Sequence, residues 1–291
     1  MQIVYVGAGL ANRMFQYAFA ISLKSKGFDV RIDEHSFIPR YDFEKLKLRD
    51  VFVNLEIEES DIKSFPNVIN NKPYIKLYRK ISEFFPDYRY IERWNLDYDS
   101  SIFDKASRNC VFVGFWISYK YFSNVDKEVK SAFVFKDPIS PQNINILNVI
   151  ENTESVAVHF RKNIDYIKNV PWTCPPSYYY KAIEIVKSKI QNPKFFFFSD
   201  NWDWVKKNIK GIDYIPVDWN PSDGPDSYCD LQLMSRCKHN IIANSTYSWW
   251  GAYLNINMNK VICAPEDWFG KMVRNIDDII PENWLLENRD F

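Results

Sequence analysis

The feature that most restricts the fold is a regular alternation of short apolar runs with helical segments in the second half of the chain. The expected elements, in order, are the strand Ser155–Phe160, the helix Ser177–Ile190, the strand Lys194–Phe198, the helix Asn201–Ile209, the strand Tyr214–Val217, the helix Cys229–Cys237, the strand Asn240–Ala243, the helix Thr246–Leu254 and the strand Lys260–Cys263. Parallel strands need long crossover connections, which are usually helices. The alternation therefore predicts a parallel sheet covered by helices on both faces.

Residues 1–34 show the same pattern on a smaller scale. Met1–Val6 is an apolar run, Gly7–Gly9 supplies a turn, and a helical period begins at Leu10 and stops at Gly27. Phe28–Asp33 then has the character of a second strand. This start predicts a strand–helix–strand unit.

The stretch between these two regions is less regular. Residues 36–109 have no sustained period, so we expect short helices and loops there. A strand at Cys110–Phe115 and helical runs at Tyr121–Ala132 and Gln142–Ile150 follow, and two prolines bracket a polar turn at Asp137–Pro141. Such a turn is typical of a domain boundary.

A chain of 291 residues is long enough for two domains of ordinary size. We therefore predict an α/β protein with two doubly wound, Rossmann-like domains, residues 1–138 and 139–291, that face each other across a cleft.

Charge and cysteine content exclude several classes of protein. The 37 basic and 37 acidic residues cancel, which argues against a dedicated nucleic-acid binder. The five cysteines are odd in number and form no C-x-x-C pair, which argues against a disulfide framework and a structural zinc site. No run approaches the ~18 apolar residues of a membrane span, and no signal peptide is recognised. We expect a protein of the cytoplasm without an integral membrane segment.

Polar side chains follow the predicted strands. In parallel α/β sheets, ligands bind beyond the carboxyl ends of the strands, where helix N-termini favour anions. The clusters at these positions are residues 7–12, 159–165, 199–201 and 244–248. The last of them places hydroxyl residues at a helix start, where they either cap the helix or hold a phosphate.

The segment from His159 to Asp165 is the most informative of these clusters. Arg161 is suited to a bidentate contact with a diphosphate, and Lys162 adds a point charge. His159 is either a ligand contact or a satisfied core residue. Asp97 and Asp99 have the spacing of a metal-binding carboxylate pair but follow no convincing strand, so we expect no metal there.

Two further patterns leave alternatives open. Gly7–Asn12 nearly matches G-x-G-x-x-G, with Asp33 at about the distance of a ribose-binding acid, so an NAD(P)-linked oxidoreductase is one alternative. The missing third glycine makes an ordinary tight turn equally acceptable. Trp249 and Trp250 fit either a packed core or the sugar platform of a non-catalytic carbohydrate-binding protein.

Four segments together resemble bacterial α-1,2-fucosyltransferases. Gly7–Tyr17 is similar to the opening G-G-L-G-N-Q-M-F-Q-Y, His159–Tyr166 to H-x-R-R-G-D-Y, and Phe197–Asn201 to F-S-D-D. Leu233–Asn255 nearly reproduces the corresponding family segment. The resemblance covers most of the chain except residues 36–109 and implies an inverting, metal-independent glycosyltransferase of the GT-B type, which moves L-fucose from GDP-fucose to the 2-hydroxyl of a galactose residue.

The resemblance also implies residue roles. Arg161 would hold the β-phosphate of the donor, and His159 and Asp200 would contact guanine. The hydroxyl residues before the tryptophan pair, Ser245, Thr246 and Ser248, would meet the phosphates, and Asn244 would also bind the donor. Domain 1–138 would then bind the acceptor and domain 139–291 the donor.

The sequence departs from the family pattern at several positions. Ala11 and Arg13 replace Gly and Gln, Lys162 replaces the second arginine, and Asn163 with Ile164 replaces a single Gly. Because two residues stand in place of one glycine, Asp165 lies one residue farther from Arg161, the first arginine of the motif.

The resemblance and the residues together predict a mechanism. Arg161, Lys162 and the helix start at 245–248 would stabilise the departing GDP without a metal or other cofactor. Asp165 is the candidate base, and Asn12 is an orienting group from the opposite domain. The expected acceptor is a galactose-containing glycan such as an O-antigen repeat unit; a lipid-linked acceptor would bring the enzyme to the inner face of a membrane.

Overall fold

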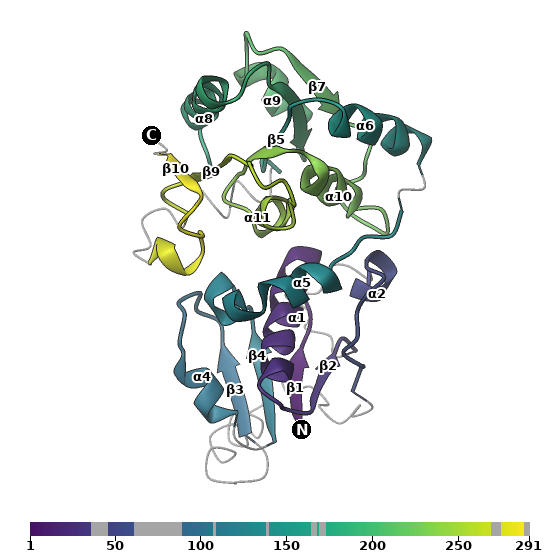
Figure 1. The fold of residues 1–291 in the computed structure, drawn as a ribbon, viewed down its shortest axis with the longest axis vertical. Helices are drawn as coiled ribbons and strands as arrows, with labels where there is room; N and C mark the ends of the chain where they lie inside the picture. Colours follow the sequence, from purple (N-terminus) through teal and green to yellow (C-terminus); the bar gives the residue numbers. More distant parts are fainter. Residues whose placement is uncertain are drawn as a thin grey trace. The chain divides into compact units, whose positions relative to one another are not determined.

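The structure is a computed structural model that describes residues 1–35, 46–60, 89–106, 109–137, 140–163, 168, 173–268 and 275–287. The chain divides into two compact units, Met1–Lys136 and Asp137–Phe291, so the division falls close to the predicted one at 138 and 139. Each unit contains its own parallel sheet (Figure 1). The predicted α/β class is therefore confirmed.

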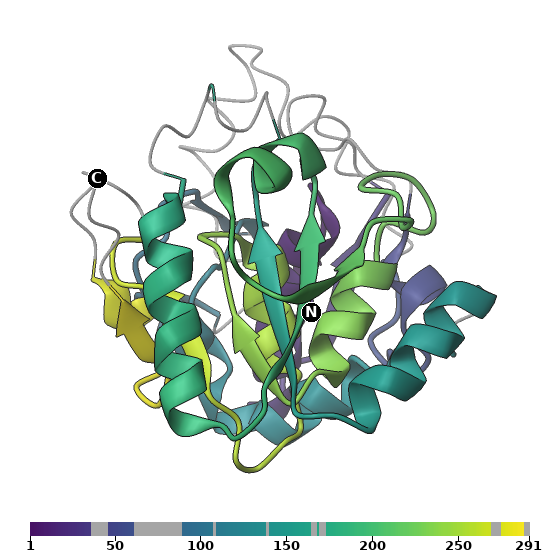
Figure 2. The same ribbon diagram turned by 90° about the horizontal axis from the view of Figure 1, so that it is seen from above.

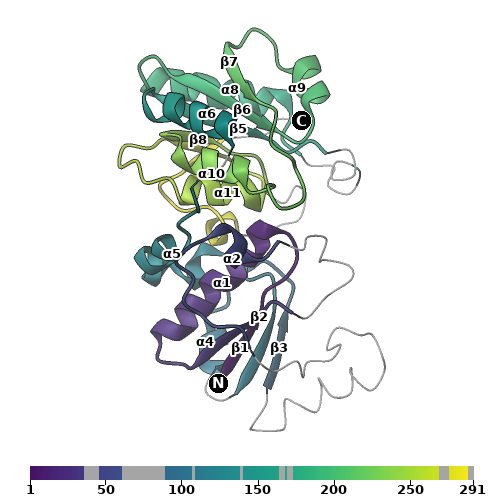
Figure 3. The same cartoon turned by 90° about the vertical axis from the view of Figure 1, so that its right-hand side faces the viewer.

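The N-terminal unit has a four-stranded sheet of order β2-β1-β4-β3. Its strands are β1 Gln2–Tyr5, β2 Val30–Asp33, β3 Arg89–Arg93 and β4 Cys110–Gly114, and every pair is parallel. The helix α1, Leu10–Ser25, connects β1 to β2 and packs along them (Figure 3). Gly27 takes a φ of +86° just after this helix, a conformation that favours glycine and ends the helix where predicted.

The strand β3 corrects our expectation of only helices and loops before Asn109. Of its five residues only Tyr90 is buried, so the strand lacks the apolar run that would have revealed it. The neighbouring β4 approaches it closely, since a Cβ on Gly114 would lie 1.9 Å from the carbonyl oxygen of Arg93. The short helices α2, Leu48–Val51, and α4, Ser101–Lys105, agree with the prediction for this region.

The helical run predicted at Tyr121–Ala132 is broken into three pieces. The structure has 3₁₀ turns η1, Tyr119–Tyr121, and η2, Ser123–Val125, before the helix α5, Asp126–Ala132. The Ser118 side chain accepts from the Lys120 N–H and so starts the first turn locally.

The C-terminal unit has a six-stranded parallel sheet of order β10-β9-β8-β5-β6-β7. Its strands are β5 Ser155–Phe160, β6 Lys194–Ser199, β7 Tyr214–Val217, β8 His239–Ile241, β9 Ile262–Pro265 and β10 Leu285–Glu287. All but β10 were predicted. The chain runs outward from β5 in one direction and from β8 in the other, so the strand order reverses between these two neighbours. In a doubly wound sheet that reversal is where ligands bind.

Helices surround the strands of this sheet (Figure 2). They are α6 Pro141–Glu151, α8 Pro176–Lys189, α9 Trp202–Asn208, α10 Cys229–Arg236 and α11 Thr246–Tyr253, with a 3₁₀ turn η3 at Ile276–Asp278. Every residue of β5 is buried. One face of the sheet packs with α8 and α9 into a core that contains Val158, Tyr179 and Phe197.

Two expectations about the whole chain can be compared with the structure. All five cysteines are buried and lie outside any disulfide bond. Within the described ranges, no helix is both long and apolar enough to cross a bilayer.

Candidate functional site

Predicted site residues gather at the carboxyl ends of β5, β6 and β8. His159 lies in β5, Arg161 and Lys162 follow it directly, and Asp200 follows β6. Residues 244–248 come after β8 and lead into α11. Because β5 and β8 are the strands between which the order reverses, this edge is the expected ligand site of the unit.

Arg161 and Asp200 form an ion pair at this edge. The Arg161 Nη1 lies 2.7 Å from the Asp200 Oδ2, and 36% of the arginine side chain but only 5% of the aspartate side chain is exposed. The second carboxylate oxygen, Oδ1, accepts the backbone N–H of Lys162. Burial raises the pKa of Asp200, while Arg161 and the Lys162 N–H oppose that shift. Asp200 therefore orients a guanidinium that is itself accessible to a ligand.

Asn201 caps the helix α9, a role that was not predicted from the sequence. Its side chain accepts the Trp204 N–H at 3.0 Å and donates to the Lys162 carbonyl oxygen at 2.9 Å. The N-cap of α9 is thus Asn201 and not its neighbour Asp200. An asparagine at the start of a predicted helix is a strong capping signal, and it was available in the sequence.

Lys162 points into the protein rather than toward a ligand. The residue is 3% exposed, and its Nζ donates to the Thr173 Oγ1 at 2.9 Å and to the Cys174 carbonyl oxygen at 2.6 Å. The Nζ also lies 4.3 Å from the centre of the Trp204 ring. A buried ammonium needs such partners. We predicted that Lys162 contacts a diphosphate. In the structure its ammonium instead binds residues 173–174 and holds that segment in place.

His159 is buried but not satisfied. Its Nδ1 has no hydrogen-bond partner in the part of the chain that the structure describes. Burial, and secondly the charge of Arg161, lower the pKa of His159 to about 3, so the imidazole is neutral. A neutral imidazole has one donor and one acceptor nitrogen. His159 is therefore not a core histidine whose ring nitrogens are both hydrogen-bonded to the described protein.

The start of α11 carries the predicted hydroxyl residues. The Ser245 side chain accepts the Tyr247 N–H at 3.3 Å and is the N-cap of the helix. Thr246 is the first helical residue and is half-buried. The capping role is thus confirmed for Ser245. A contact between these residues and phosphate stays a prediction. Capping is compatible with it, because a serine that accepts a hydrogen bond at its oxygen still has a hydroxyl hydrogen to donate.

Asn244 and Ser248 lie deeper in the unit. The Asn244 Oδ1 is 3.5 Å from the Cys174 Sγ, and both residues are buried. The Ser248 hydroxyl is 3.4 Å from the carbonyl oxygens of Ala243 and Ser245. These contacts join the end of β8 to the segment held by Lys162.

The role of Tyr247, within the cluster 244–248, was not predicted either. Its hydroxyl donates to the Ser227 carbonyl oxygen at 2.6 Å and accepts the Leu231 N–H at 2.9 Å. Its ring centre lies 5.9 Å from that of His159. Tyr247 thus joins the start of α11 to the start of α10. The sequence carries no signal for this role, because Tyr247 stands between Thr246 and Ser248 and no periodic pattern distinguishes it from them.

A polar network extends this region toward α10. The Asn220 Nδ2 donates to the Asp230 Oδ1 at 2.8 Å, the Asn143 Nδ2 donates to the Asn220 Oδ1 at 3.0 Å, and the Trp219 Nε1 donates to the Asn143 Oδ1 at 2.8 Å. Burial raises the pKa of Asp230 to about 7, and the bond from Asn220 opposes the shift.

The two candidates for handling the acceptor have different outcomes. Asn12 is half-buried in the first turn of α1, in the N-terminal unit, and its backbone N–H donates to the Gly9 carbonyl oxygen at 2.9 Å. Asp165 lies outside the described residues. The catalytic roles of both stay predictions.

Asp99 has structural partners. Its Oδ2 lies 3.0 Å from the Arg93 Nη1, and its Oδ1 accepts the Ser101 hydroxyl at 2.6 Å. These contacts lower the pKa of Asp99, with the Ser101 bond as the largest cause. A strand, β3, does precede Asp97, contrary to our expectation. Among the described residues, no group of three or more metal-ligating side chains is found.

The structure also bears on the two alternative functions. The Gly7 N–H donates to the Gln16 Oε1 at 2.8 Å, and an Asp33 carboxylate oxygen accepts the His35 N–H at 3.1 Å. Groups that a dinucleotide would use are thus bonded within the protein. Trp249 and Trp250 are fully buried, and the Trp249 Nε1 donates to the Ile279 carbonyl oxygen, so the sugar-platform interpretation is wrong.

Comparison with known proteins adds relatives along the whole chain. A model of glycosyl transferase family 11 matches residues 1–288. The alpha-1,2-colitosyltransferase of Escherichia coli is 31% identical over 97% of this chain and 97% of its own length. The O-antigen biosynthesis glycosyltransferase WbnK of Escherichia coli is 27% identical over 96% of this chain and 98% of its own length.

A solved structure shares the fold. The crystal structure of NodZ alpha-1,6-fucosyltransferase soaked with GDP-fucose aligns with a TM-score of 0.52 at 15% identity, over 87% of this chain and 91% of that one. The likeness confirms the predicted GT-B-like class with Rossmann-like units. A cleft between the units stays a prediction.

Proposed function

Because the chain belongs to glycosyl transferase family 11, it is a glycosyltransferase, and we propose that it transfers L-fucose from GDP-fucose to the 2-hydroxyl group of a galactose residue with inversion. The observation that carries this proposal is the half-accessible Arg161, held by Asp200 beside the point where the strand order reverses. A guanidinium in that place suits the diphosphate of a nucleotide sugar.

In this proposal the site accelerates transfer by stabilising the leaving group, GDP. Negative charge grows on GDP as the bond from fucose to phosphate breaks, and the acceptor hydroxyl attacks from the opposite side of the sugar. Arg161 supplies positive charge for the diphosphate oxygens of the departing GDP. The N-terminus of α11, with Ser245 and Thr246, supplies preorganised hydrogen-bond donors for the same oxygens. Lys162 contributes indirectly, because its buried ammonium holds the residues beneath the site.

We propose that His159 binds the nucleobase. Its neutral imidazole carries an unpartnered nitrogen in a buried position, which suits a hydrogen bond to guanine. Asp200 adds a carboxylate whose first task is to orient Arg161. Asn244 and Ser248 support the adjoining strand end.

The acceptor side rests on the N-terminal unit. We propose Asn12 as an orienting group for the acceptor hydroxyl and Asp165 as the candidate base. The acceptor is a galactose-containing glycan such as an O-antigen repeat unit, in line with the name of one relative. A lipid-linked form of that glycan would draw a cytoplasmic enzyme to the inner membrane surface, and we propose that no metal takes part.

Colitosyl transfer is a second candidate, which the relative at 31% identity favours. The deciding experiment supplies GDP-fucose and GDP-colitose separately with an array of galactosides and determines the product linkage by NMR. We expect an α-1,2-fucosylated galactoside. Preference for GDP-colitose would overturn the donor assignment, and transfer to another hydroxyl would overturn the linkage.

Ligand protection separates the transferase from an oxidoreductase. A ligand that binds only the folded state raises the melting temperature. GDP should therefore protect the protein against thermal unfolding, whereas NAD and NADP should not. Protection by NAD without protection by GDP would refute the proposal.

A further inference from the structure

The turn between β1 and α1 has an unusual backbone. Ala8 takes a φ of +72°, in the left-handed region that favours glycine, although glycines stand on both sides of it. Residues with a Cβ keep this conformation only where their surroundings impose it. The contacts around Ala8 therefore identify what holds the turn.

Two buried side chains from α1 hold this turn. The Arg13 Nε donates to the Ala8 carbonyl oxygen at 2.5 Å, and its Nη1 donates to the Leu46 carbonyl oxygen at 2.8 Å. One turn further along the helix, the Gln16 Nε2 donates to the Gly114 carbonyl oxygen at 2.7 Å while its Oε1 accepts the Gly7 N–H. The turn is thus fastened both to the end of β4 and to the segment before α2.

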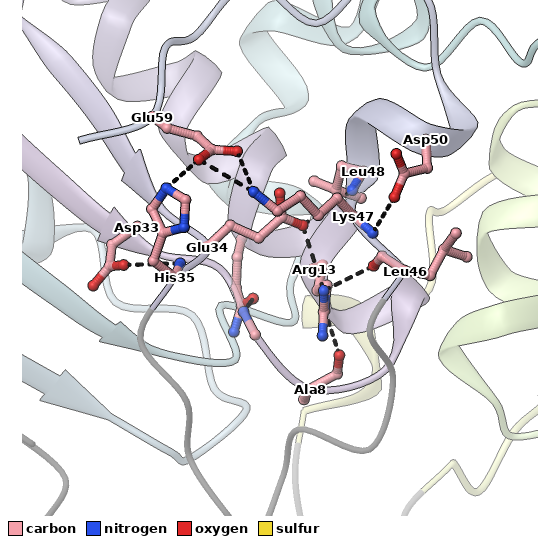
Figure 4. Close-up of polar contacts among 12 residues, drawn as sticks. Ala8, Arg13, Asp33, Glu34, His35, Leu46, Lys47, Leu48, Asp50 and Glu59 are labelled. Carbon is pink, nitrogen blue, oxygen red and sulfur yellow. Dashed lines mark hydrogen bonds and ion pairs between the residues drawn. The ribbon is translucent and has the colours of Figure 1, made fainter. Parts of the chain in front are cut away.

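Glu34, directly after β2, balances the charge of Arg13. Its Oε1 lies 3.4 Å from the Arg13 Nη1 and accepts the Leu48 N–H at 3.0 Å (Figure 4). The Glu34 side chain is 1% exposed, and its Oε2 has no hydrogen-bond partner among the described residues. Burial raises the pKa of Glu34, and Arg13 with the Leu48 N–H opposes that shift.

Stability alone does not account for this pair. Removing two charges from water costs about as much as their attraction returns, so a well-packed apolar pair would stabilise a fold equally well. The positions that the pair fixes are more informative, because Arg13 and Glu34 together contact the β1–α1 turn, the end of β2 and the start of α2 (Figure 4).

A half-exposed group of charges borders the pair. The Lys47 Nζ lies 3.0 Å from the Glu59 Oε1, and the His35 ring contacts the same carboxylate. Lys47 and Glu59 influence the pKa of Glu34 in opposite directions. Among the charged neighbours, Arg13 has the largest effect on the pKa of Glu34.

The element that this pair holds begins with Gly9, the N-cap of α1, and carries Asn12 in its first turn. A Cβ on Gly9 would meet no atom within 4 Å, so the described protein leaves this stretch of backbone uncrowded. Resting on the proposed function, we propose that Arg13 and Glu34 are positioning residues, which hold the Ala8 turn and the first turn of α1 in the geometry that receives the acceptor.

The comparison of Arg13→Gln, Glu34→Gln and the double variant tests this proposal. Each single change leaves one buried charge unpaired, so kcat/KM for the acceptor should fall at least tenfold, while the Kd for GDP stays within twofold of the wild type. In the double variant no buried charge is left, and glutamine, the residue of the family pattern at position 13, is still able to donate. It should lose less activity than either single variant.

Lys24→Gln is the matched control, because Lys24 lies on the same helix in an exposed pair with Glu56. It should leave the acceptor kinetics unchanged. Wild-type acceptor kinetics in the single variants, or an equal loss of GDP affinity, would show that the pair is merely structural.

Hydrogen exchange supplies a readout that does not need activity. Amides of residues 7–14 should lose protection in Glu34→Gln but not in Lys24→Gln. Unchanged exchange would overturn the positioning role. If the wild-type enzyme transfers to no galactoside while Glu34→Gln still shows this change in exchange, the proposed function is overturned, but Arg13 and Glu34 still hold the Ala8 turn.

Discussion

Replacing His159 with asparagine should remove one contribution to the acid sensitivity of the C-terminal unit. Burial and Arg161 lower the pKa of His159 from its ordinary value near 6.5 to about 3. Below pH 6.5 the unfolded chain therefore binds a proton that the folded chain does not. The contribution of His159 to the free energy of unfolding is therefore fully present above pH 6.5 and is lost progressively as the pH falls toward 3.

The size of the effect follows from the shift. Each pKa unit corresponds to ~1.4 kcal/mol, so lowering the pH from 7.5 to 5.0 should cost the wild-type protein roughly 2 kcal/mol through this group. Asparagine does not titrate and should lack this loss. Urea unfolding at both pH values, followed by tryptophan fluorescence, gives the two free-energy changes, and their difference removes any pH-independent cost of the substitution.

His35→Asn is the matched control, because the His35 side chain is half exposed and lies in the other unit. It should leave the acid loss of the C-terminal unit as in the wild type. Equal acid losses in His159→Asn and the wild type would mean that the imidazole titrates normally. The case for a neutral histidine at the nucleobase would then fail.

Other changes test separate parts of the molecule. Arg161→Lys should lower kcat/KM by roughly a hundredfold, because lysine lacks the fork that meets a diphosphate; steady-state activity within about threefold of the wild type would refute the role. Gly114→Ala should cost more than ~2 kcal/mol in denaturant unfolding, because the new Cβ would overlap the Arg93 carbonyl oxygen, and an unchanged midpoint would contradict the close approach of β3 and β4. Asp230→Asn should raise the melting temperature at pH 8 but not at pH 4. The raised pKa of that carboxyl, about 7, makes its ionisation destabilising by up to ~4 kcal/mol above neutrality, and the penalty vanishes below the ordinary value of 3.8; an equal gain at both pH values would exclude this cause. Transfer should survive excess EDTA, and loss of activity that Mn²⁺ restores would require a metal-dependent mechanism.

The sequence by itself determined most elements of the C-terminal unit, β10 being an exception. The central strand Ser155–Phe160 has the bounds that the sequence predicts. Central parallel strands are buried on both faces, so their apolar runs and the polar residues that end them are visible without any tertiary information. The same reasoning located Arg161 and Asp200 at neighbouring strand ends, because parallel strands finish at one edge of a sheet.

The tertiary structure decided what an apolar pattern does not encode. The edge strand β3 owes its existence to pairing with β4 and buries only Tyr90, so its own residues carry no strand period. The direction of a long side chain is equally hidden. Lys162 reads as a ligand for phosphate, yet a hydroxyl at Thr173 and the ring of Trp204 draw its ammonium inward.

The roles of single polar groups depend on distant partners in the same way. Asp200 orients an arginine that lies 39 positions earlier, while its neighbour Asn201 caps the helix. Arg13 is buried because Glu34 and the Leu46 carbonyl meet it there. A sequence specifies where polar residues end a strand, but the hydrogen-bond partners that satisfy a buried charge exist only once the chain has folded.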